Sequence, residues 1–134
     1  MGPKERNRSG SNNKAPKDLL QKALTLRDSG DYKQAEELLV SLVGKYPGDL
    51  DLRIVYAGLL FALKRYCESM DHFRVILKVR PRAEPASLGL FHALWKTGQR
   101  REAVEEVRRF FDGGGESMEY RRLLKDIAKT VLQG

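Results

Sequence analysis

The sequence predicts an all-α protein of about seven helices, and three observations support this prediction. Apolar residues recur every three or four positions in each segment between turn signals, which is the period of an amphipathic helix. No segment shows the strict alternation of apolar and polar residues that is typical of a half-buried β-strand. The sequence also resembles itself when it is shifted by 34 residues. Its 134 residues, 41% apolar and 32% charged, suit one domain with a continuous core.

The predicted helices follow one another with short connections. One helix begins after Pro16 and ends at residues 29–31, and a second ends at residues 46–49, because Gly and Pro at these points are helix stop signals. Asp31 and Asp49 are candidate N-caps of the helices that follow. Further helices are predicted at about 50–63, 66–79, 84–97, 99–111 and 117–132. Connections this short predict antiparallel neighbours.

Residues 1–16 are predicted to form a disordered basic tail. This segment is rich in turn formers and like charges and has too little apolar surface to offset the entropic cost of ordering. Residues 1–17 carry five basic groups and one acidic group, whereas residues 18–95 carry eleven basic and ten acidic groups. Most of the formal net charge of +7 therefore lies in the tail, which weakens the case for a nucleic-acid surface on the folded part.

Three sets of similar residues recur at the 34-residue period. They are the leucines Leu26, Leu60 and Leu94, the small residues Ala35, Ser69 and Ala103, and the prolines Pro47 and Pro81. Ala23 and Ala57 add a further small position three residues before the first two leucines. A small residue early in one helix, a large residue three positions later, a small residue in the next helix and a closing proline together resemble the tetratricopeptide repeat.

The resemblance covers about residues 17–115 and implies a right-handed α-solenoid of antiparallel helix pairs. Its three repeats are placed at about 16–49, 50–83 and 84–115, within one domain of residues 17–134. The helix at about 117–132 is then expected to be a C-terminal capping helix that covers the end of the core. Three positions depart from the pattern: Lys22 replaces a leucine, Phe91 replaces a small residue and Gly115 replaces a proline.

The same resemblance implies a concave groove lined by the first helix of each pair. The residues at groove positions are Leu20, Leu24 and Arg27 in the first repeat, Asp51, Ile54, Gly58 and Phe61 in the second, and Leu88, His92, Trp95 and Lys96 in the third. Family members that bind chaperone tails hold a terminal carboxylate with lysines and asparagines, and here those places carry Leu20, Leu24, Val55, Pro85 and Gly89. Binding of an acidic chaperone tail is therefore not expected.

The groove is instead predicted to be apolar with a few basic edges. It would accept an amphipathic helix or an extended apolar peptide, with Phe61 and Trp95 as anchors. A second interpretation stays open, in which these two rings pack on the chain's own capping helix or tail. His92 is interpreted as a groove-wall or core histidine.

No catalytic or metal-binding constellation is evident, and no cofactor is expected. Cys67 is interpreted as a partly buried packing residue, because His72 lies on roughly the wrong side of the same helix to activate it. A single cysteine also excludes sets of thiolate ligands for a metal. Gly113-Gly114-Gly115 lacks the Lys and Ser/Thr of a phosphate-binding loop and is interpreted as a flexible joint. We therefore expect that the protein is not an enzyme.

The expected function is that of a protein-interaction module, either an adaptor or an assembly chaperone. A single cysteine, a charged N-terminus and the lack of a long apolar stretch favour a cytoplasmic protein without membrane insertion. Two alternatives remain. One is a self-assembling scaffold, and thus a homo-oligomer; the other is a nucleic-acid-associated protein that uses the basic tail and the arginines of the third repeat, Arg100, Arg101, Arg108 and Arg109.

Overall fold

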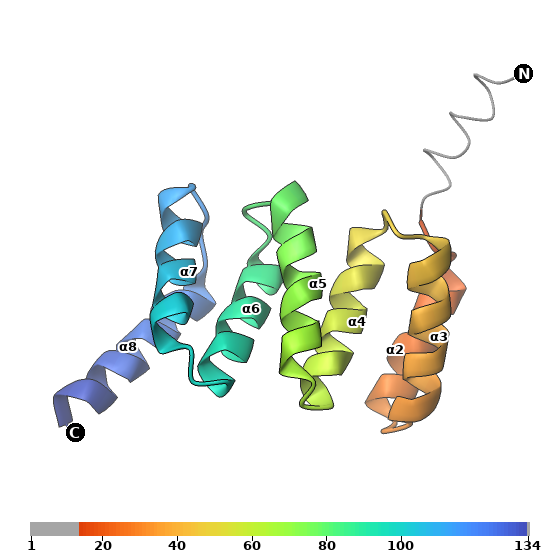
Figure 1. Ribbon diagram of the computed structural model, residues 1–134, viewed down its shortest axis with the longest axis horizontal. Helices are drawn as coiled ribbons and strands as arrows, with labels where there is room; N and C mark the ends of the chain where they lie inside the picture. The colour runs from red at the N-terminus through yellow and green to blue at the C-terminus, as the bar shows by residue number, and fades with distance from the viewer. Residues whose placement is uncertain (1–13, 134) are drawn as a thin grey trace, which may run out of the picture.

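The computed structural model describes residues 14–133, and its secondary structure consists of seven α-helices within that range. They are α2 (Lys17–Asp28), α3 (Tyr32–Lys45), α4 (Leu50–Ala62), α5 (Tyr66–Val79), α6 (Glu84–Lys96), α7 (Arg100–Asp112) and α8 (Met118–Gln133). Successive helices run antiparallel and stack side by side into an extended row, so the protein is an all-α solenoid (Figure 1). Within residues 14–133, no helix is both long and apolar enough to cross a membrane.

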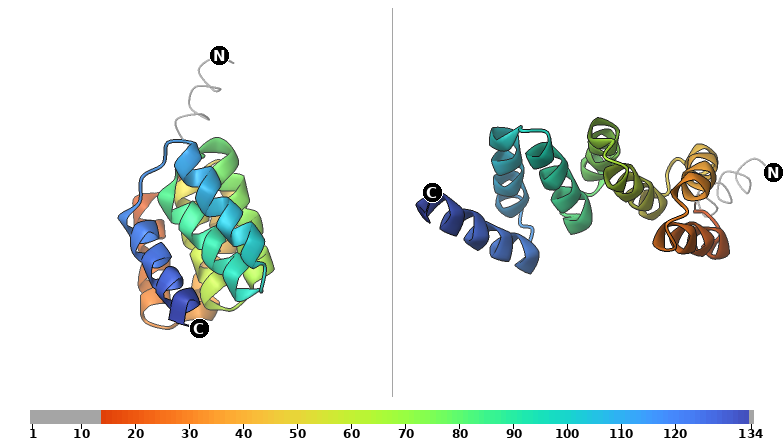
Figure 2. Two further views of the ribbon diagram at one scale, coloured as in Figure 1. Left: turned by 90° about the vertical axis from the view of Figure 1, so that its left-hand side faces the viewer. Right: turned by 90° about the horizontal axis from the view of Figure 1, so that it is seen from below.

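The helices form two layers. Seen from below in Figure 2, α3, α5 and α7 lie along one side of the row, and α2, α4, α6 and α8 lie along the other. The row bends so that its two end helices, α2 and α8, project furthest on the second side. The face formed by the first helix of each pair is therefore the concave face of the solenoid.

A left-handed residue ends the first helix of each pair. Gly30 and Gly98 have φ angles of 85° and 81°, and Lys64, at the equivalent position, has a φ of 64°. The amide of the next residue then reaches back to the carbonyl five positions earlier, as from Asp31 to Leu26 at 2.9 Å. This is the Schellman arrangement, which satisfies the last helical carbonyls and turns the chain sharply. This turn recurs every 34 residues, so the repeat in the sequence is also a repeat of backbone conformation.

The two predicted N-caps behave differently. Asp49 caps α4, because its Oδ1 accepts a hydrogen bond from the amide of Leu52 at 3.0 Å. Its Oδ2 accepts a second bond, from the amide of Ala15 at 2.8 Å, so one buried carboxylate ties the segment before α2 to the start of α4. Asp31 stands at the N-cap position of α3, as predicted, but its side chain makes no capping hydrogen bond.

The segment predicted as a disordered tail, residues 1–16, lies outside the described residues except for residues 14–16. Within that part, Ala15 is buried and bonded to Asp49 as described above. Lys14 forms an exposed ion pair with Asp51 at 3.7 Å. The described chain therefore begins beside the loop that connects α3 to α4.

The buried side chains form two clusters along the row. The N-terminal cluster, from α2, α3 and α4, is aliphatic and contains Leu39, Leu42, Leu52 and Leu59 together with small alanines. The C-terminal cluster is centred on α5, α6 and α7 and reaches Tyr120 at the start of α8. The buried core is thus divided into two clusters that both include residues of α4, and its chemistry changes from one end of the solenoid to the other.

A polar cluster inside the C-terminal core joins three helices. The buried Ser87 of α6 donates a hydrogen bond to Glu106 Oε2 of α7 at 2.6 Å, and its hydroxyl lies 2.7 Å from the Tyr120 hydroxyl of α8. Arg109 donates two further bonds to Glu106, each at 2.7 Å. Burial raises the pKa of Tyr120 well above its ordinary value, so this tyrosine is a neutral hydrogen-bonding group.

Two interpretations of single residues are corrected by the structure. Gly113-Gly114-Gly115 is a defined turn and not a flexible joint, because Gly114 has a φ of 90° and a Cβ added to Gly115 would lie 2.6 Å from Cζ of Phe110. Cys67, expected to be partly buried, is exposed on α5. Hydrophobic period alone does not distinguish a position at the edge of a helix face from one inside it.

Candidate partner-binding surface

The residues predicted to line the groove all lie on the first helices of the three pairs. Leu20, Leu24 and Arg27 are on α2; Asp51, Ile54, Gly58 and Phe61 are on α4; and Leu88, His92, Trp95 and Lys96 are on α6. These helices belong to the layer that forms the concave face (Figure 2). Because matching residues are 34 positions apart, Leu20, Ile54 and Leu88 occupy the same place in successive repeats.

Most of these side chains are neither fully buried nor fully open. Ile54, Phe61, Leu88 and Trp95 are half-buried and pack against the C-terminal core with part of their surface. Leu20 packs against the N-terminal core in the same way. A half-buried apolar side chain is held in position by the fold and still presents area to a partner, which is the arrangement expected of an interaction surface.

An aromatic row runs from α4 to α6. The ring of Phe61 makes edge contact with Tyr66 at 5.1 Å and with His92 at 6.5 Å between centroids. Trp95 stacks on Phe91 at 5.6 Å, with an interplanar angle of 22°. The structure thus brings Phe61 and His92, which are 31 positions apart in the sequence, to one place.

Two residues that contact this aromatic row were not predicted from the sequence to belong to the groove. Tyr66, the first residue of α5, packs edge-on against Phe61. The guanidinium of Arg100 lies 4.9 Å from the centre of the Trp95 ring, in a cation–π contact. Both residues lie where the first helix of a pair connects to the second. The apolar periodicity of a single helix does not predict contacts made at such a connection.

Burial lowers the pKa of His92 below its ordinary value, and the nearby Lys96 adds to this shift while Glu119 opposes it. His92 is therefore neutral at neutral pH, although its surface is exposed in part. Its ring contacts Phe91 at 5.5 Å as well as Phe61. A neutral imidazole among aromatic rings contributes an amphipathic contact area and one polar edge rather than a positive charge.

The charged groove residues are partly engaged by the chain itself. Asp51 accepts from Arg80 at 3.3 Å and pairs with Lys14 at 3.7 Å, in ion pairs whose side chains are at least half exposed. Arg27 contacts Asp28 at 3.0 Å. Exposed pairs of this kind contribute little to stability, so these groups remain exchangeable for a partner's charges.

Two of the four third-repeat arginines considered for nucleic-acid binding make contacts within the chain. Arg109 binds Glu106 and the carbonyl of Pro81, and Arg100 lies against Trp95. Arg100 also lines a shallow hollow of about 580 Å³ on α7, together with Arg101 and Arg108. Among the described residues no group of three or more His, Cys, Asp or Glu side chains is placed to hold a metal ion.

A tetratricopeptide-repeat family model matches residues 26–79. No curated protein sequence matches the chain. Among solved structures, the chain is similar to MamA residues 41 to end from Desulfovibrio magneticus RS-1, with a TM-score of 0.71, 20% identity and coverage of 89% of this chain and 71% of that chain.

The chain is also similar to the first tetratricopeptide repeat domain of Spaghetti (RPAP3), solved with the HSP90 peptide SRMEEVD. The TM-score is 0.71 at 17% identity, and the match covers 85% of this chain and 93% of that chain. A MamA mutant gives a TM-score of 0.64 at 22% identity, covering 73% and 74%. Five other MamA chains are matched over only 52% to 62% of their length. At these identities the likeness establishes the fold.

Proposed function

Because this chain has the repeat architecture of the tetratricopeptide-repeat family, we propose that it is a protein-interaction module that holds a partner's peptide or amphipathic helix on its concave face. The observation that carries the proposal is the row of half-buried apolar and aromatic side chains at matching positions of α2, α4 and α6. Aromatic side chains such as Phe61 and Trp95 supply large contact areas at low entropic cost. The proposed role is that of an adaptor or an assembly chaperone, without catalysis.

The Spaghetti domain shares this fold and was solved with a bound peptide, which supports a peptide-binding role for a domain of this size. The ligand proposed here differs from an acidic chaperone tail. Leu20, Leu24 and Val55 offer no donor for a terminal carboxylate, and neither does Pro85. At Gly89 a Cβ would lie 2.2 Å from Cζ of Phe73, so the core leaves no room there for a longer side chain.

Calorimetric titration with the peptide SRMEEVD tests the chemistry of the ligand. We expect no measurable binding to the wild-type chain at concentrations up to about 1 mM, which corresponds to a binding free energy weaker than about −4 kcal/mol. Micromolar binding would contradict the proposed apolar groove and would favour a carboxylate-binding one.

The partner itself is best sought by affinity capture from the native cell extract. We expect a protein that is retained by the wild type and lost by Phe61→Ala/Trp95→Ala, because the double change removes the two largest side chains of the surface. Val40→Ala/Val79→Ala is the matched control, since these exposed valines lie on α3 and α5, in the other layer. Circular dichroism must show that all variants are folded.

The single tryptophan, Trp95, gives a second readout in solution, because its fluorescence should change when a partner covers it. Retention of the same partner by both double variants would place binding outside the concave face. Concentration-dependent elution of the wild type on a sizing column would favour the self-assembling scaffold. A steep loss of partner binding as the salt concentration rises would favour the nucleic-acid-associated alternative.

A cytoplasmic location is part of the proposal. It is supported by the single cysteine, which is exposed and thus free to form unwanted disulfides in an oxidising compartment. Fractionation of the native cells would test it.

A further inference from the structure

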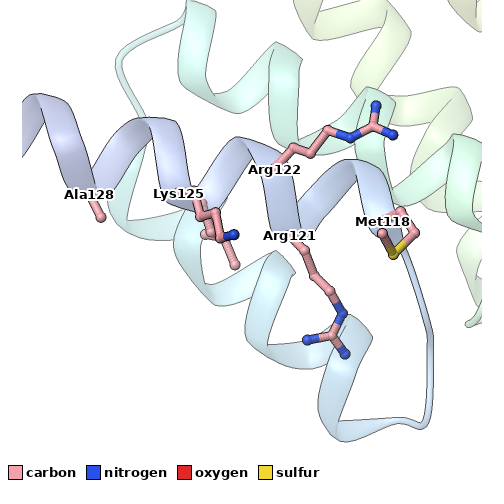
Figure 3. Close-up of a pocket in the computed structure, with 6 residues that line it drawn as sticks. Met118, Arg121, Arg122, Lys125 and Ala128 are labelled. Carbon is pink, nitrogen blue, oxygen red and sulfur yellow. The ribbon is translucent and has the colours of Figure 1, made fainter.

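The outer face of α8 is an apolar surface that no other helix of the described chain covers. Met118 is 67% exposed and Leu124 is 38% exposed, and both line an open hollow of about 520 Å³. Ala128, Arg121, Arg122 and Lys125 complete its lining. Figure 3 shows these side chains gathered along α8, with Arg121 and Arg122 extending in opposite directions from the helix.

The repeat register shows that this surface is at positions where helices pack. Leu124 and Ala128 lie 34 residues after Leu90 and Leu94, which are only 5% and 2% exposed in α6, a helix packed against α7. One repeat earlier still, Leu60 of α4 is fully buried. Leu124 and Ala128 therefore occupy positions that are buried in α6 and are exposed in α8.

The opposite face of α8 holds the helix to the core. Tyr120 is buried among Phe91, Phe110 and Phe111, with ring centroids 5.3 to 5.8 Å away, and Leu123 and Ile127 pack against the same core. The hydroxyl of Ser117 caps the helix by accepting from the amide of Tyr120 at 3.0 Å. The outer face is thus presented on an anchored helix and is not needed to hold α8 in place.

The charged residues around this surface indicate which kind of partner it would bind. Arg121 lies 5.2 Å from the Phe111 ring centre and pairs with Glu116 at 3.1 Å, while Arg122 contacts Glu119 only at 3.8 Å, with both side chains mostly exposed. Lys125 lines the same hollow and adds a third positive charge. Exposed pairs with these distances are readily exchanged, so the apolar surface is flanked by cations available to a partner's carboxylates.

We propose that the outer face of α8 docks an amphipathic helix of an acidic partner protein. The partner's apolar stripe would pack over Leu124, Ala128 and the adaptable Met118, and its flanking Glu or Asp side chains would meet Arg121, Arg122 and Lys125. A second copy of this chain is a poor occupant, because the same face of each copy carries Arg121, Arg122 and Lys125, whose like charges would repel. All residues of this surface lie on α8, whereas the groove residues of the proposed function lie on α2, α4 and α6.

The test uses two synthetic amphipathic helical peptides with the same leucine stripe, one flanked by glutamates and the other by lysines. Each is titrated into the isotope-labelled full chain and followed by NMR. We expect the acidic peptide to shift the amide signals of α8 and to bind at least about tenfold more tightly than the basic one. Leu124→Asp, and separately Arg122→Glu/Lys125→Glu, should each weaken the acidic peptide at least about tenfold.

Two control variants separate this proposal from the proposed function. Val79→Asp changes an exposed valine of α5 and should leave the acidic peptide's affinity unchanged, as should Phe61→Ala/Trp95→Ala. Equal affinity of the two peptides, signal shifts confined to α2, α4 and α6, or no binding by the wild type would overturn the proposal. So would a concentration-dependent dimer that Leu124→Asp converts to a monomer, since a second copy would then be the occupant.

Discussion

In the N-terminal half of the solenoid the described buried core is aliphatic, whereas the core of the C-terminal half includes four buried aromatic rings, Phe73, Phe91, Phe110 and Tyr120. The two halves nevertheless share one backbone pattern, with matching helix ends at Gly30 and Gly98. The contrast is sharpest at one repeat position, where Ala23 in α2 corresponds to Phe91 in α6.

The larger side chain has a structural consequence. Phe91 is 2% exposed and reaches Tyr120 of α8 in an edge contact at 5.8 Å, so the ring fills space between the last pair and the following helix. Ala23, by contrast, sits among short aliphatic neighbours. The repeat thus fixes helix ends and directions, while local side-chain volume decides how the neighbouring helix is held.

The largest expected effect tests how tightly the C-terminal half is packed. Gly89→Ala should destabilise the fold by about 3 kcal/mol, because the new Cβ would lie within 2.6 Å of three Phe73 ring atoms. Gly58→Ala is the control, since no atom lies within 4 Å of its added Cβ and alanine favours a helix by up to about 1 kcal/mol. Denaturant unfolding compares the two. Similar losses of stability in both variants would show that the close contact between α5 and α6 does not limit the stability of the fold.

The buried polar cluster is the next most sensitive feature. Glu106→Ala leaves Ser87 and Arg109 without their main partner and should destabilise the protein by about 2 kcal/mol, a figure reduced because Arg109 is 40% exposed. Glu105→Ala changes an exposed neighbour and should alter stability by less than about 0.5 kcal/mol. Chemical denaturation of both variants checks the difference. A small loss for Glu106→Ala would mean that the aromatic contacts alone hold the C-terminal half.

The N-terminal half depends on a single buried carboxylate. Asp49→Ala removes the cap of α4 and the bond from Ala15, and should destabilise the fold by about 1–2 kcal/mol. Asp31→Ala should cost less than about 0.5 kcal/mol, because Asp31 makes no capping bond. Thermal unfolding measures both. Equal losses would indicate that charge near the helix start, and not hydrogen bonding, is the source of the stabilisation.

A smaller effect concerns the helix ends that the halves share. Lys64 is the one non-glycine residue with positive φ among residues 14–133. Lys64→Gly should therefore stabilise the protein by up to about 1 kcal/mol, since glycine adopts this conformation without strain. An unchanged or lower melting temperature would mean that the gain in the folded state is cancelled by the greater flexibility of glycine in the unfolded chain.

The smallest expected effect is a pH dependence from two histidines, His72 on α5 and His92 on α6. Burial lowers the pKa of His72, with Arg53 adding to the shift and Asp71 and Glu68 opposing it, and burial also lowers the pKa of His92. Because the unfolded chain then binds protons more readily, stability should fall as pH drops below the ordinary histidine value of 6.5.

Unfolding curves between pH 7.5 and 5.5 measure this loss. His72→Gln/His92→Gln should flatten the profile over that window, because the variant no longer has groups that gain a proton on unfolding there. A profile equally steep in both proteins would assign the pH dependence to other groups.

The helices, their order and the 34-residue repeat could be predicted from the amino-acid sequence. Helix positions follow from apolar periodicity and from glycine and proline stop signals, which are local properties of the chain. The shared position of Leu20, Ile54 and Leu88 on successive first helices likewise follows from the period alone. Which of these positions line a groove is implied only by the resemblance to the tetratricopeptide repeat, and the period adds the correspondence between repeats.

The contacts of those side chains, in contrast, became known from the folded structure. It placed Arg100 on Trp95 and Tyr66 against Phe61, buried Glu106 beside Ser87, closed Gly114 and Gly115 into a turn, and left Cys67 and the outer face of α8 exposed. These outcomes depend on side-chain volume and direction across helix interfaces. Periodicity reports which face of a helix is apolar, but not which helix, if any, covers it.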